Sequence, residues 1–260
     1  MADHRVHVKA APVGFRDVPP ATSDLLVVVP ALNEAGSVAE VVRGIRAAVP
    51  AATCLVVDDG STDDTAAIAR NAGGRVLRLP FNLGVGGAMR TGFRFARTHG
   101  YRVVIQVDAD GQHDPQDIPR LVAALSDADL VIGSRFTGES SYGVRGPRRW
   151  AMHVLAWAVG GLAHRRLTDV TSGFKAAGPR AVALFAHTYP AEYLGDTVEA
   201  LVIAARAGLL LEEIPVDMRE RQAGRPSHHP VRATVYLLRA GIAFLLATLQ
   251  PRVPIESTSA

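Results

Sequence analysis

The sequence predicts an α/β protein with a doubly wound, mostly parallel sheet. Between Asp24 and Gly133, short apolar runs alternate with amphipathic segments of helical period, which is the rhythm of βαβ units. The first run, Leu25–Val29, is apolar throughout, as expected of a strand that helices cover on both faces. Polar motifs directly follow several runs, where ligand sites lie in open α/β sheets.

The N-terminal half contains five expected strands joined by helices. Ser37 and Glu40 predict a capping box for the first helix, and Gly73 with Gly74 predicts the end of the second. In chain order, we expect strands at 25–29, 53–57, 75–79, 103–107 and 130–132, and helices from 38 onward, from 63–65 to 73, at 85–98 and at 115–125.

After Gly133 the alternation breaks. We expect a Gly- and Arg-rich loop at 136–149, a helix at 150–162, an edge strand at 173–177, helices at 179–186 and 197–207, a strand at 211–218, a polar loop at 219–229 and a last helix at 231–249. The chain therefore divides into a flexible tail (1–23), one domain (24–229), and a C-terminal amphipathic helix with a tail (230–260).

Composition excludes some classes of function. A formal charge of +3 over 260 residues is too weak to imply nucleic-acid binding. The one cysteine, Cys54, cannot form an internal disulfide and fits a reducing compartment, so we expect a cytoplasmic protein. The apolar run Ile242–Leu249 is too short to span a bilayer, which needs ~20 residues. The chain is therefore expected to be soluble or peripheral at the inner face of the membrane.

Two carboxylates follow the fourth expected strand at a spacing of two. Asp108 and Asp110 precede Gln112 at the same spacing, and Gly111 permits a turn between them. Residues spaced by two point the same way along a strand, so these oxygens are expected to converge. Carboxylate and amide oxygens suit Mg²⁺ or Mn²⁺. The alternative is a polar turn after a core strand.

Three further motifs follow the first three strands. Pro30–Glu34 could hold a ribose or base, or could only supply polarity before a helix. Val57–Ser61 carries adjacent carboxylates that could bind ribose hydroxyls or favour a helix dipole. Asn82–Gly87 is rich in glycine, but tight turning and close helix packing explain it better than phosphate binding.

In this order the motifs resemble the nucleotide-binding half of family 2 glycosyltransferases of the GT-A fold, and among these the dolichol- and polyprenol-phosphate sugar transferases. The matching segments are Pro30–Glu34, Val57–Asp63, Asn82–Gly87, Gln106–Pro115, Gly133–Arg135, Thr171–Phe174 and Ile214–Arg221. The resemblance implies a single GT-A domain, with a nucleotide-sugar half (24–135) and an acceptor half (136–229).

The resemblance also implies site residues. The base and ribose would be surrounded by Pro30, Leu32, Glu34, Val57 and Asp59, and the sugar and diphosphate would meet Asp108, Ala109 and Asp110. Asp110 and Gln112 would be direct ligands of Mg²⁺ or Mn²⁺, with Asp108 close by. Arg135 and Arg221 would neutralise phosphate, and Arg148, Arg149 and Ser172 would face the acceptor. Leu32 departs from the aromatic residue usual in the family.

The implied activity is inverting transfer of a sugar from a nucleotide-sugar of the GDP-mannose or UDP-glucose type to polyprenyl phosphate. An anionic phosphate acceptor needs no base, whereas a soluble hydroxyl acceptor, the first alternative, would need Asp196 or Glu199. A second alternative is a non-catalytic partner subunit. The helix at 150–162, with Trp150 and arginine flanks, suits either a membrane interface or packing on the sheet.

Overall fold

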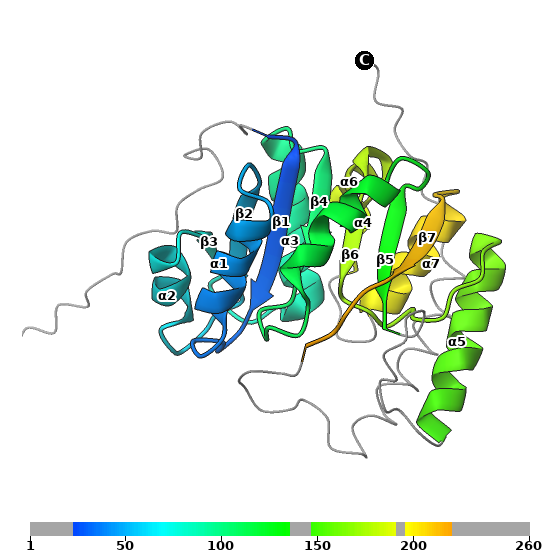
Figure 1. Cartoon of the computed structure of the whole chain (residues 1–260), viewed down its shortest axis with the longest axis horizontal. Coiled ribbons are helices and arrows are strands. Elements are labelled where there is room, and N and C mark those ends of the chain that lie inside the picture. Colours follow the sequence, from blue (N-terminus) through cyan, green and yellow to red (C-terminus); the bar gives the residue numbers. More distant parts are fainter. Residues whose placement is uncertain (1–22, 136–146, 191–195, 220–260) are drawn as a thin grey trace, which may run out of the picture.

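The apolar runs of the sequence lie side by side in one seven-stranded sheet, in the order β3-β2-β1-β4-β6-β5-β7 (Figure 1). The computed structural model describes residues 23–135, 147–190 and 196–219, to which all structural statements refer. The strands are β1 (Leu25–Ala31), β2 (Thr53–Asp58), β3 (Arg75–Arg78), β4 (Val103–Gln106), β5 (Leu130–Ser134), β6 (Lys175–Ala177) and β7 (Leu211–Pro215). The predicted α/β fold with a mostly parallel sheet is confirmed.

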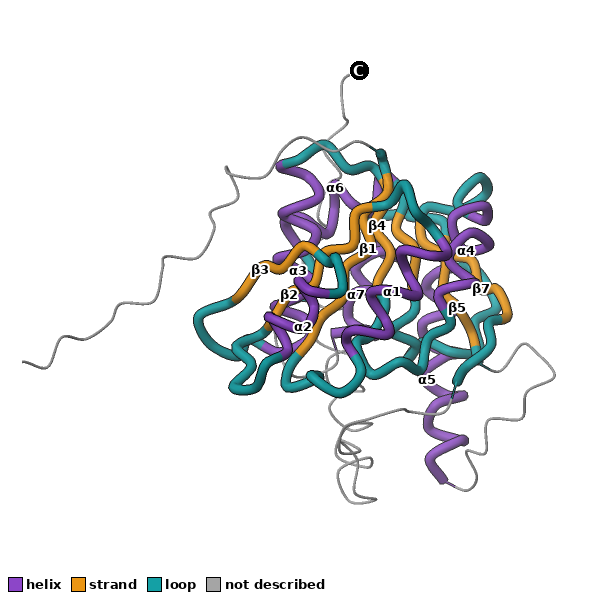
Figure 2. Tube along the Cα trace, turned by 60° about the vertical axis from the view of Figure 1, so that its left-hand side comes forward, coloured by secondary structure: helices purple, strands orange, loops and turns teal. Residues whose placement is uncertain are grey.

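Helices cover both faces of this sheet (Figure 2). They are α1 (Val38–Ala48), α2 (Thr65–Asn71), α3 (Gly84–Thr98), the 3₁₀ turn η2 (Pro115–Asp117), α4 (Ile118–Ala124), α5 (Pro147–Ala163), α6 (Pro179–Thr188) and α7 (Asp196–Arg206). One buried apolar cluster joins the sheet to α3, α5, α6 and α7, and another joins it to α1, α2 and α4. The sheet is therefore buried on both faces, as its apolar strands predict.

The strand register brings the carboxyl ends of β2, β1 and β4 to one edge of the sheet. β1 is parallel to both neighbours, with Pro30 opposite Val57 of β2 and Val28 opposite Gln106 of β4. The polar motifs after these strands therefore share that edge.

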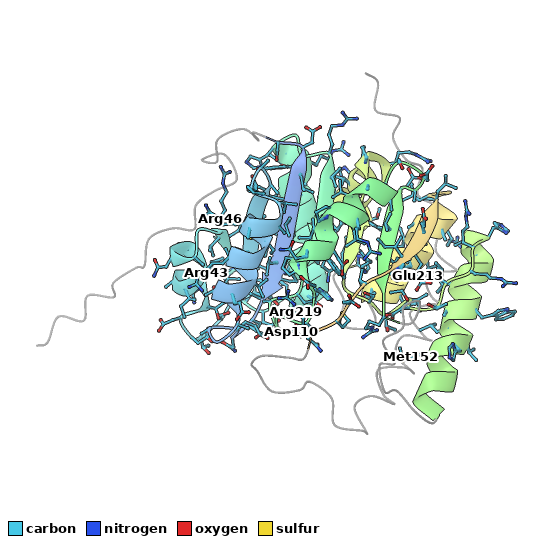
Figure 3. The ribbon with its side chains drawn as sticks, in the orientation of Figure 1. Arg43, Arg46, Asp110, Met152, Glu213 and Arg219 are labelled. Atoms are coloured by element: carbon cyan, nitrogen blue, oxygen red, sulfur yellow. The ribbon has the colours of Figure 1, made fainter. Side chains whose placement is uncertain are left out.

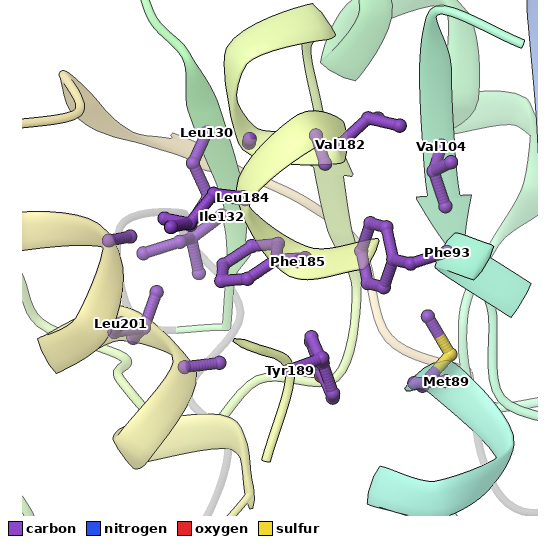
Figure 4. Close-up of a cluster of buried hydrophobic side chains, with 14 of the residues drawn as sticks. Met89, Phe93, Val104, Leu130, Ile132, Val182, Leu184, Phe185, Tyr189 and Leu201 are labelled. Carbon is purple, nitrogen blue, oxygen red and sulfur yellow. The ribbon is translucent and has the colours of Figure 1, made fainter. Parts of the chain in front are cut away.

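The cluster under α3 and α6 contains three aromatic rings in mutual contact (Figure 4). The Phe93 centroid lies 5.1 Å from those of both Phe185 and Tyr189, and these two are 5.2 Å apart in an edge-to-face arrangement. Such pairs add to the free energy of apolar burial. They join α3 to α6, which are distant in sequence.

The start of α1 differs from the predicted capping box. Ser37 precedes the helix, but no side-chain hydrogen bond caps α1. The Ser37 hydroxyl instead donates to the Glu34 carboxylate (Oγ to Oε2, 2.9 Å). The prediction was wrong because a second acceptor lies in the preceding loop.

The strand at β6 is also a correction. It was expected at an edge of the sheet, but it lies between β4 and β5 and is antiparallel to both. All three of its residues are buried. Its small alanines fit a crowded interior position, which a pattern of three residues could not distinguish from an edge.

The expected tail before residue 23 and the expected helix at 231–249 lie outside the described residues. Within the described ranges, no helix is long and apolar enough to cross a membrane. The remaining boundaries follow the expected ranges, with four exceptions: 115–125 divides into η2 and α4, α5 begins at Pro147 within the expected loop, β6 begins at Lys175, and β7 ends at Pro215.

Candidate active site

Two loops at the carboxyl edge of the sheet are joined by hydrogen bonds. Asn33, in the β1–α1 loop, donates its backbone N–H to Ser61 Oγ (2.9 Å), and its Oδ1 accepts from the Thr62 N–H (2.8 Å). The Glu34 N–H donates to Thr65 Oγ1 (2.8 Å). The motifs that were expected to surround a base and ribose therefore lie against each other.

Asp59, expected to contact the nucleotide, binds the start of α3. Its Oδ1 accepts from the Leu83 N–H and its Oδ2 from the Gly84 N–H, each at 2.7 Å. The side chain is buried, and burial raises the pKa of Asp59 although both hydrogen bonds act to lower it. Gly84 has φ 81°, so the expected tight turn of the Gly-rich loop is confirmed. The capping role of Asp59 was not predicted.

The other residues expected near the nucleotide differ in exposure. Leu32 is 38% exposed and Glu34 is half-buried. Pro30 and Val57 are buried within their strands, and Ala109 is buried after β4. Because these three side chains face the interior, only their backbone atoms could meet a ligand.

The carboxylates after β4 lie in a turn, which corrects the strand geometry expected for them. β4 ends at Gln106, and Asp110 Oδ1 accepts from the Gln112 N–H (3.0 Å), with Gly111 at φ 78°. This turn, which we call the carboxylate turn, therefore brings Asp108, Asp110 and Gln112 to the edge of the sheet. The alternation of side chains along a strand does not. All three side chains are partly exposed.

The segment after β7 crosses to this turn. The Arg219 N–H donates to the Gln112 carbonyl (2.9 Å), and its guanidinium binds Asp114 (Nη2 to Oδ2, 2.7 Å). Figure 3 shows Arg219 beside Asp110. Arg219 was not predicted as a site residue, although its spacing of two from Arg221 was a signal that both could face one way along an extended segment.

Arg135, expected to neutralise a phosphate, forms a two-bond ion pair with buried Asp169. Its Nε lies 2.6 Å from Asp169 Oδ2, and its Nη2 lies 2.7 Å from Oδ1 and 2.8 Å from Thr171 Oγ1. Glu213 of β7 in turn accepts from the Asp169 N–H (2.6 Å). This network holds the segment before β6. No local pattern predicts it, because its partners are far apart in sequence.

The expected acceptor residues are described only in part. Ser172 is buried, and its Oγ accepts from the Phe174 N–H (3.2 Å), so its hydroxyl is engaged within its own turn. Arg148 and Arg149 lie in the first turn of α5 and Asp196 begins α7, but their side chains are outside the described part. Arg221 lies wholly outside it.

The donor set at the turn fits a hard divalent cation. Among the described residues, no group of three or more His, Cys, Asp and Glu side chains could hold a metal ion by itself. The two partly exposed carboxylates and the amide of Gln112 offer oxygen ligands only, which suits Mg²⁺ or Mn²⁺ that also binds substrate phosphates. The fit therefore depends on a phosphate-bearing ligand completing the coordination.

Comparison with known sequences decides the family. The model of the family "Glycosyl transferase family 2" matches residues 26–182, a span that includes both joined loops, the carboxylate turn and β6. The chain belongs to glycosyl transferase family 2. It is thus a glycosyltransferase, and the resemblance stated from the motifs is confirmed.

Individual relatives agree with this assignment. Undecaprenyl-phosphate mannosyltransferase of Micrococcus luteus is 36% identical over 213 residues, covering 77% of this chain and 85% of that protein. Polyprenol monophosphomannose synthase of Mycolicibacterium smegmatis is 32% identical over 168 residues, covering 60% and 62%. These two relatives bear the names of polyprenyl-phosphate mannosyltransferases.

A solved structure confirms the GT-A fold. Glucosyl-3-phosphoglycerate synthase from Mycobacterium tuberculosis, crystallised with Mn²⁺, uridine diphosphate and phosphoglyceric acid, matches with a TM-score of 0.66. The match covers 87% of this chain and 79% of that one, at 23% identity. At this identity the likeness concerns the fold.

Proposed function

We propose that this family 2 glycosyltransferase transfers a sugar, with inversion, from a nucleotide-sugar to polyprenyl phosphate, with Mg²⁺ or Mn²⁺ as cofactor. The 36% identity to undecaprenyl-phosphate mannosyltransferase across 77% of the chain carries this proposal. The donor is of the GDP-mannose or UDP-glucose type. The carboxylate turn at the edge of β4 supports the site assignment.

The donor would lie across the carboxyl ends of β2, β1 and β4. Leu32 and Glu34 would contact the base and ribose from the β1–α1 loop, and the residues around Asp59 would contact them from the β2–α2 loop. Hydrogen bonds hold these two loops together. The diphosphate would then reach Asp108 and Asp110 after β4. This arrangement follows the rule that ligands bind outside the carboxyl ends of parallel strands.

Asp110 and Gln112 would hold the cation, with Asp108 beside it. When bound there, the cation neutralises charge that develops on the departing diphosphate. Arg221 would add positive charge, because it follows Arg219 on the segment bound to this turn. A phosphate acceptor is already anionic near neutral pH and can attack the anomeric carbon without a base.

Helix α5 supports a lipid-linked acceptor. Its Leu155, Ala156 and Val159 are buried in the core, whereas Trp157 is 79% exposed and Val154 43% exposed. The buried face of α5 therefore packs in the core, whereas its exposed face fits a membrane interface. The exposed apolar face would contact the membrane surface, while Arg148 and Arg149 in the first turn would receive the phosphate. Figure 3 shows Met152, near the start of α5, toward the same edge as Asp110.

The experiment measures sugar transfer to polyprenyl phosphate in anionic liposomes, for several nucleotide-sugars with Mn²⁺. The variants are wild type, Arg148→Ala with Arg149→Ala, and Asp196→Asn. We expect the double-arginine variant to lose at least about tenfold in transfer, because each basic residue near an anionic surface contributes about 1 kcal/mol. Its hydrolysis of the donor by water should change much less.

Asp196→Asn is expected to retain transfer to the phosphate acceptor. The proposal would be replaced by its hydroxyl-acceptor alternative if wild type left polyprenyl phosphate untouched, glycosylated a water-soluble alcohol, and lost that activity in Asp196→Asn. A chain without turnover on any donor would point to the non-catalytic partner subunit.

A further inference from the structure

The orientation of the Asp108 carboxylate is set by neighbouring groups. Asp108 follows the end of β4, and its side chain is 37% exposed, so neither strand geometry nor burial fixes its torsion angles. Three constraints act on Asp108 instead. We define the groups that make them, Gln106, His113 and Gly173, as the Asp108 clamp.

The first contact comes from Gln106, the last residue of β4. Its Nε2 donates to Asp108 Oδ1 at 3.1 Å, and the residue is 4% exposed. A buried amide on a central strand has few alternative rotamers. This hydrogen bond therefore holds one oxygen of the carboxylate.

The second contact comes from His113. The Asp108 backbone N–H donates to His113 Nδ1 at 3.0 Å, so Nδ1 must be unprotonated and the ring proton lies on Nε2. Nε2 is 3.7 Å from Asp108 Oδ2, too far for a hydrogen bond, so His113 holds the Asp108 backbone and packs beside its carboxylate. The ring is buried and stacks on Phe174, with centroids 4.8 Å apart and planes at 11°. Stacking prevents the imidazole from turning away from Asp108.

The third constraint is steric and depends on the absence of a side chain at Gly173. A Cβ there would lie 2.7 Å from Asp108 Oδ2, 3.1 Å from Oδ1 and 3.1 Å from Gln106 Nε2. Real Cβ atoms essentially never approach another atom as closely as 2.7 Å. Any other residue would displace the carboxylate or the backbone that carries it. Gly173 also precedes Phe174, which stacks on His113, so the segment before β6 constrains both Asp108 and His113.

We propose that Gln106, His113 and Gly173 are positioning residues, which hold the Asp108 carboxylate in the orientation that serves the donor and its cation. This inference rests on the proposed function, in which Asp108 lies beside the cation. Mutation of groups that orient a ligand without touching the metal commonly lowers metal affinity or activity by about 10–100-fold.

The test compares His113→Leu, His113→Asn and Gly173→Ala with wild type. The measurements are kcat, KM for the nucleotide-sugar, the affinity for Mn²⁺ in the presence of GDP or UDP, and the melting temperature. We expect His113→Leu and Gly173→Ala to lose about tenfold or more in kcat and in Mn²⁺ affinity, beyond any change in melting temperature. His113→Asn should recover most of this loss, because its Oδ1 can accept from the Asp108 N–H.

Gly161→Ala is the matched control for Mn²⁺ affinity, since a Cβ there meets nothing within 4 Å, and it should bind Mn²⁺ as wild type does. Nitrogen-15 NMR of the wild type should find the His113 proton on Nε2. The clamp is refuted by wild-type kcat and Mn²⁺ affinity in Gly173→Ala, by His113→Asn as impaired as His113→Leu, or by a proton on Nδ1. If wild type transfers no sugar, the proposed function fails, and Mn²⁺ affinity with the NMR result still decides the clamp.

Discussion

Among single residues, Cys54 has a strongly shifted ionisation. It lies in β2, is 5% exposed, and belongs to the cluster under α1. Burial raises the pKa of its thiol to about 12, although nearby Arg46 acts to lower it. The thiol therefore stays protonated in the folded protein at a pH where an unfolded chain would carry a thiolate. Stability from this group is present below pH 9 and is lost as the pH rises toward 12.

We predict that this loss can be measured against Cys54→Ala. From pH 8.5 to 10.5, wild type should lose about 2 kcal/mol more unfolding free energy than the variant, because only wild type releases the thiol proton on unfolding. Urea titrations at both pH values measure the difference. The cavity in Cys54→Ala lowers stability at every pH and does not alter the comparison. Equal pH slopes in the two proteins would show that the thiol is not shifted.

At the scale of elements, α3 depends on a residue of another loop for its N-terminus. The Leu83 and Gly84 N–H groups have no partner within the helix and bind the Asp59 carboxylate instead. An anionic side chain at this position also interacts favourably with the helix dipole. The Gly-rich loop is therefore held in place by the loop after β2.

Asp59→Ala should destabilise the fold by about 1–2 kcal/mol, because it leaves the Leu83 N–H without its acceptor and removes one of the two acceptors of the Gly84 N–H, which also donates to Asn82 Oδ1 (2.8 Å). The variant no longer buries a carboxylate, and the relief of this burial cost, which raises the pKa of Asp59, offsets part of the lost stability. Chemical denaturation measures the effect. Asp64→Ala is the matched control, since Asp64 precedes α2 in an exposed position without a side-chain capping bond. Its change should stay within about 0.5 kcal/mol, and a similar value for Asp59→Ala would contradict the capping role.

On the scale of the whole molecule, the candidate site is assembled from loops that only the sheet brings together. Hydrogen bonds join the β1–α1 loop to the β2–α2 loop, and they join the segment after β7 to the carboxylate turn. A ligand that contacts several of these segments stabilises the folded state against the unfolded chain. Its effect should depend on the cation if the turn after β4 holds one.

We therefore predict that GDP or UDP with Mn²⁺, at about 100 times the dissociation constant, adds about 2.7 kcal/mol and raises the melting temperature by about 5–10 °C. Asp110→Ala should lose most of this shift. Asp127→Ala should keep it, because Asp127 is exposed and precedes β5, at the opposite edge of the sheet. A shift that survives in EDTA, or in Asp110→Ala, would remove the cation from the site.

Several features of the candidate site could be predicted because they depend on local pattern and on the parallel sheet. Glu34, Asp59 and Asp108 follow three strands whose carboxyl ends meet at one edge. The roles of Asp59 and Arg135 within the fold could not be predicted, since their partners are the start of α3 and Asp169. Nothing in the residues around Asp59 or Arg135 identifies a partner so far along the chain.

The sequence by itself determined the alternation of strands and helices, the parallel sheet and the position of the carboxylate turn, because apolar period and strand-end polarity are local properties. Tertiary structure alone decided that β6 is inserted antiparallel between β4 and β5. That insertion brings Gly173 and Phe174 against Asp108 and His113. Such contacts depend on which strands become neighbours, and this is settled by the packing of the whole core and not by any single segment.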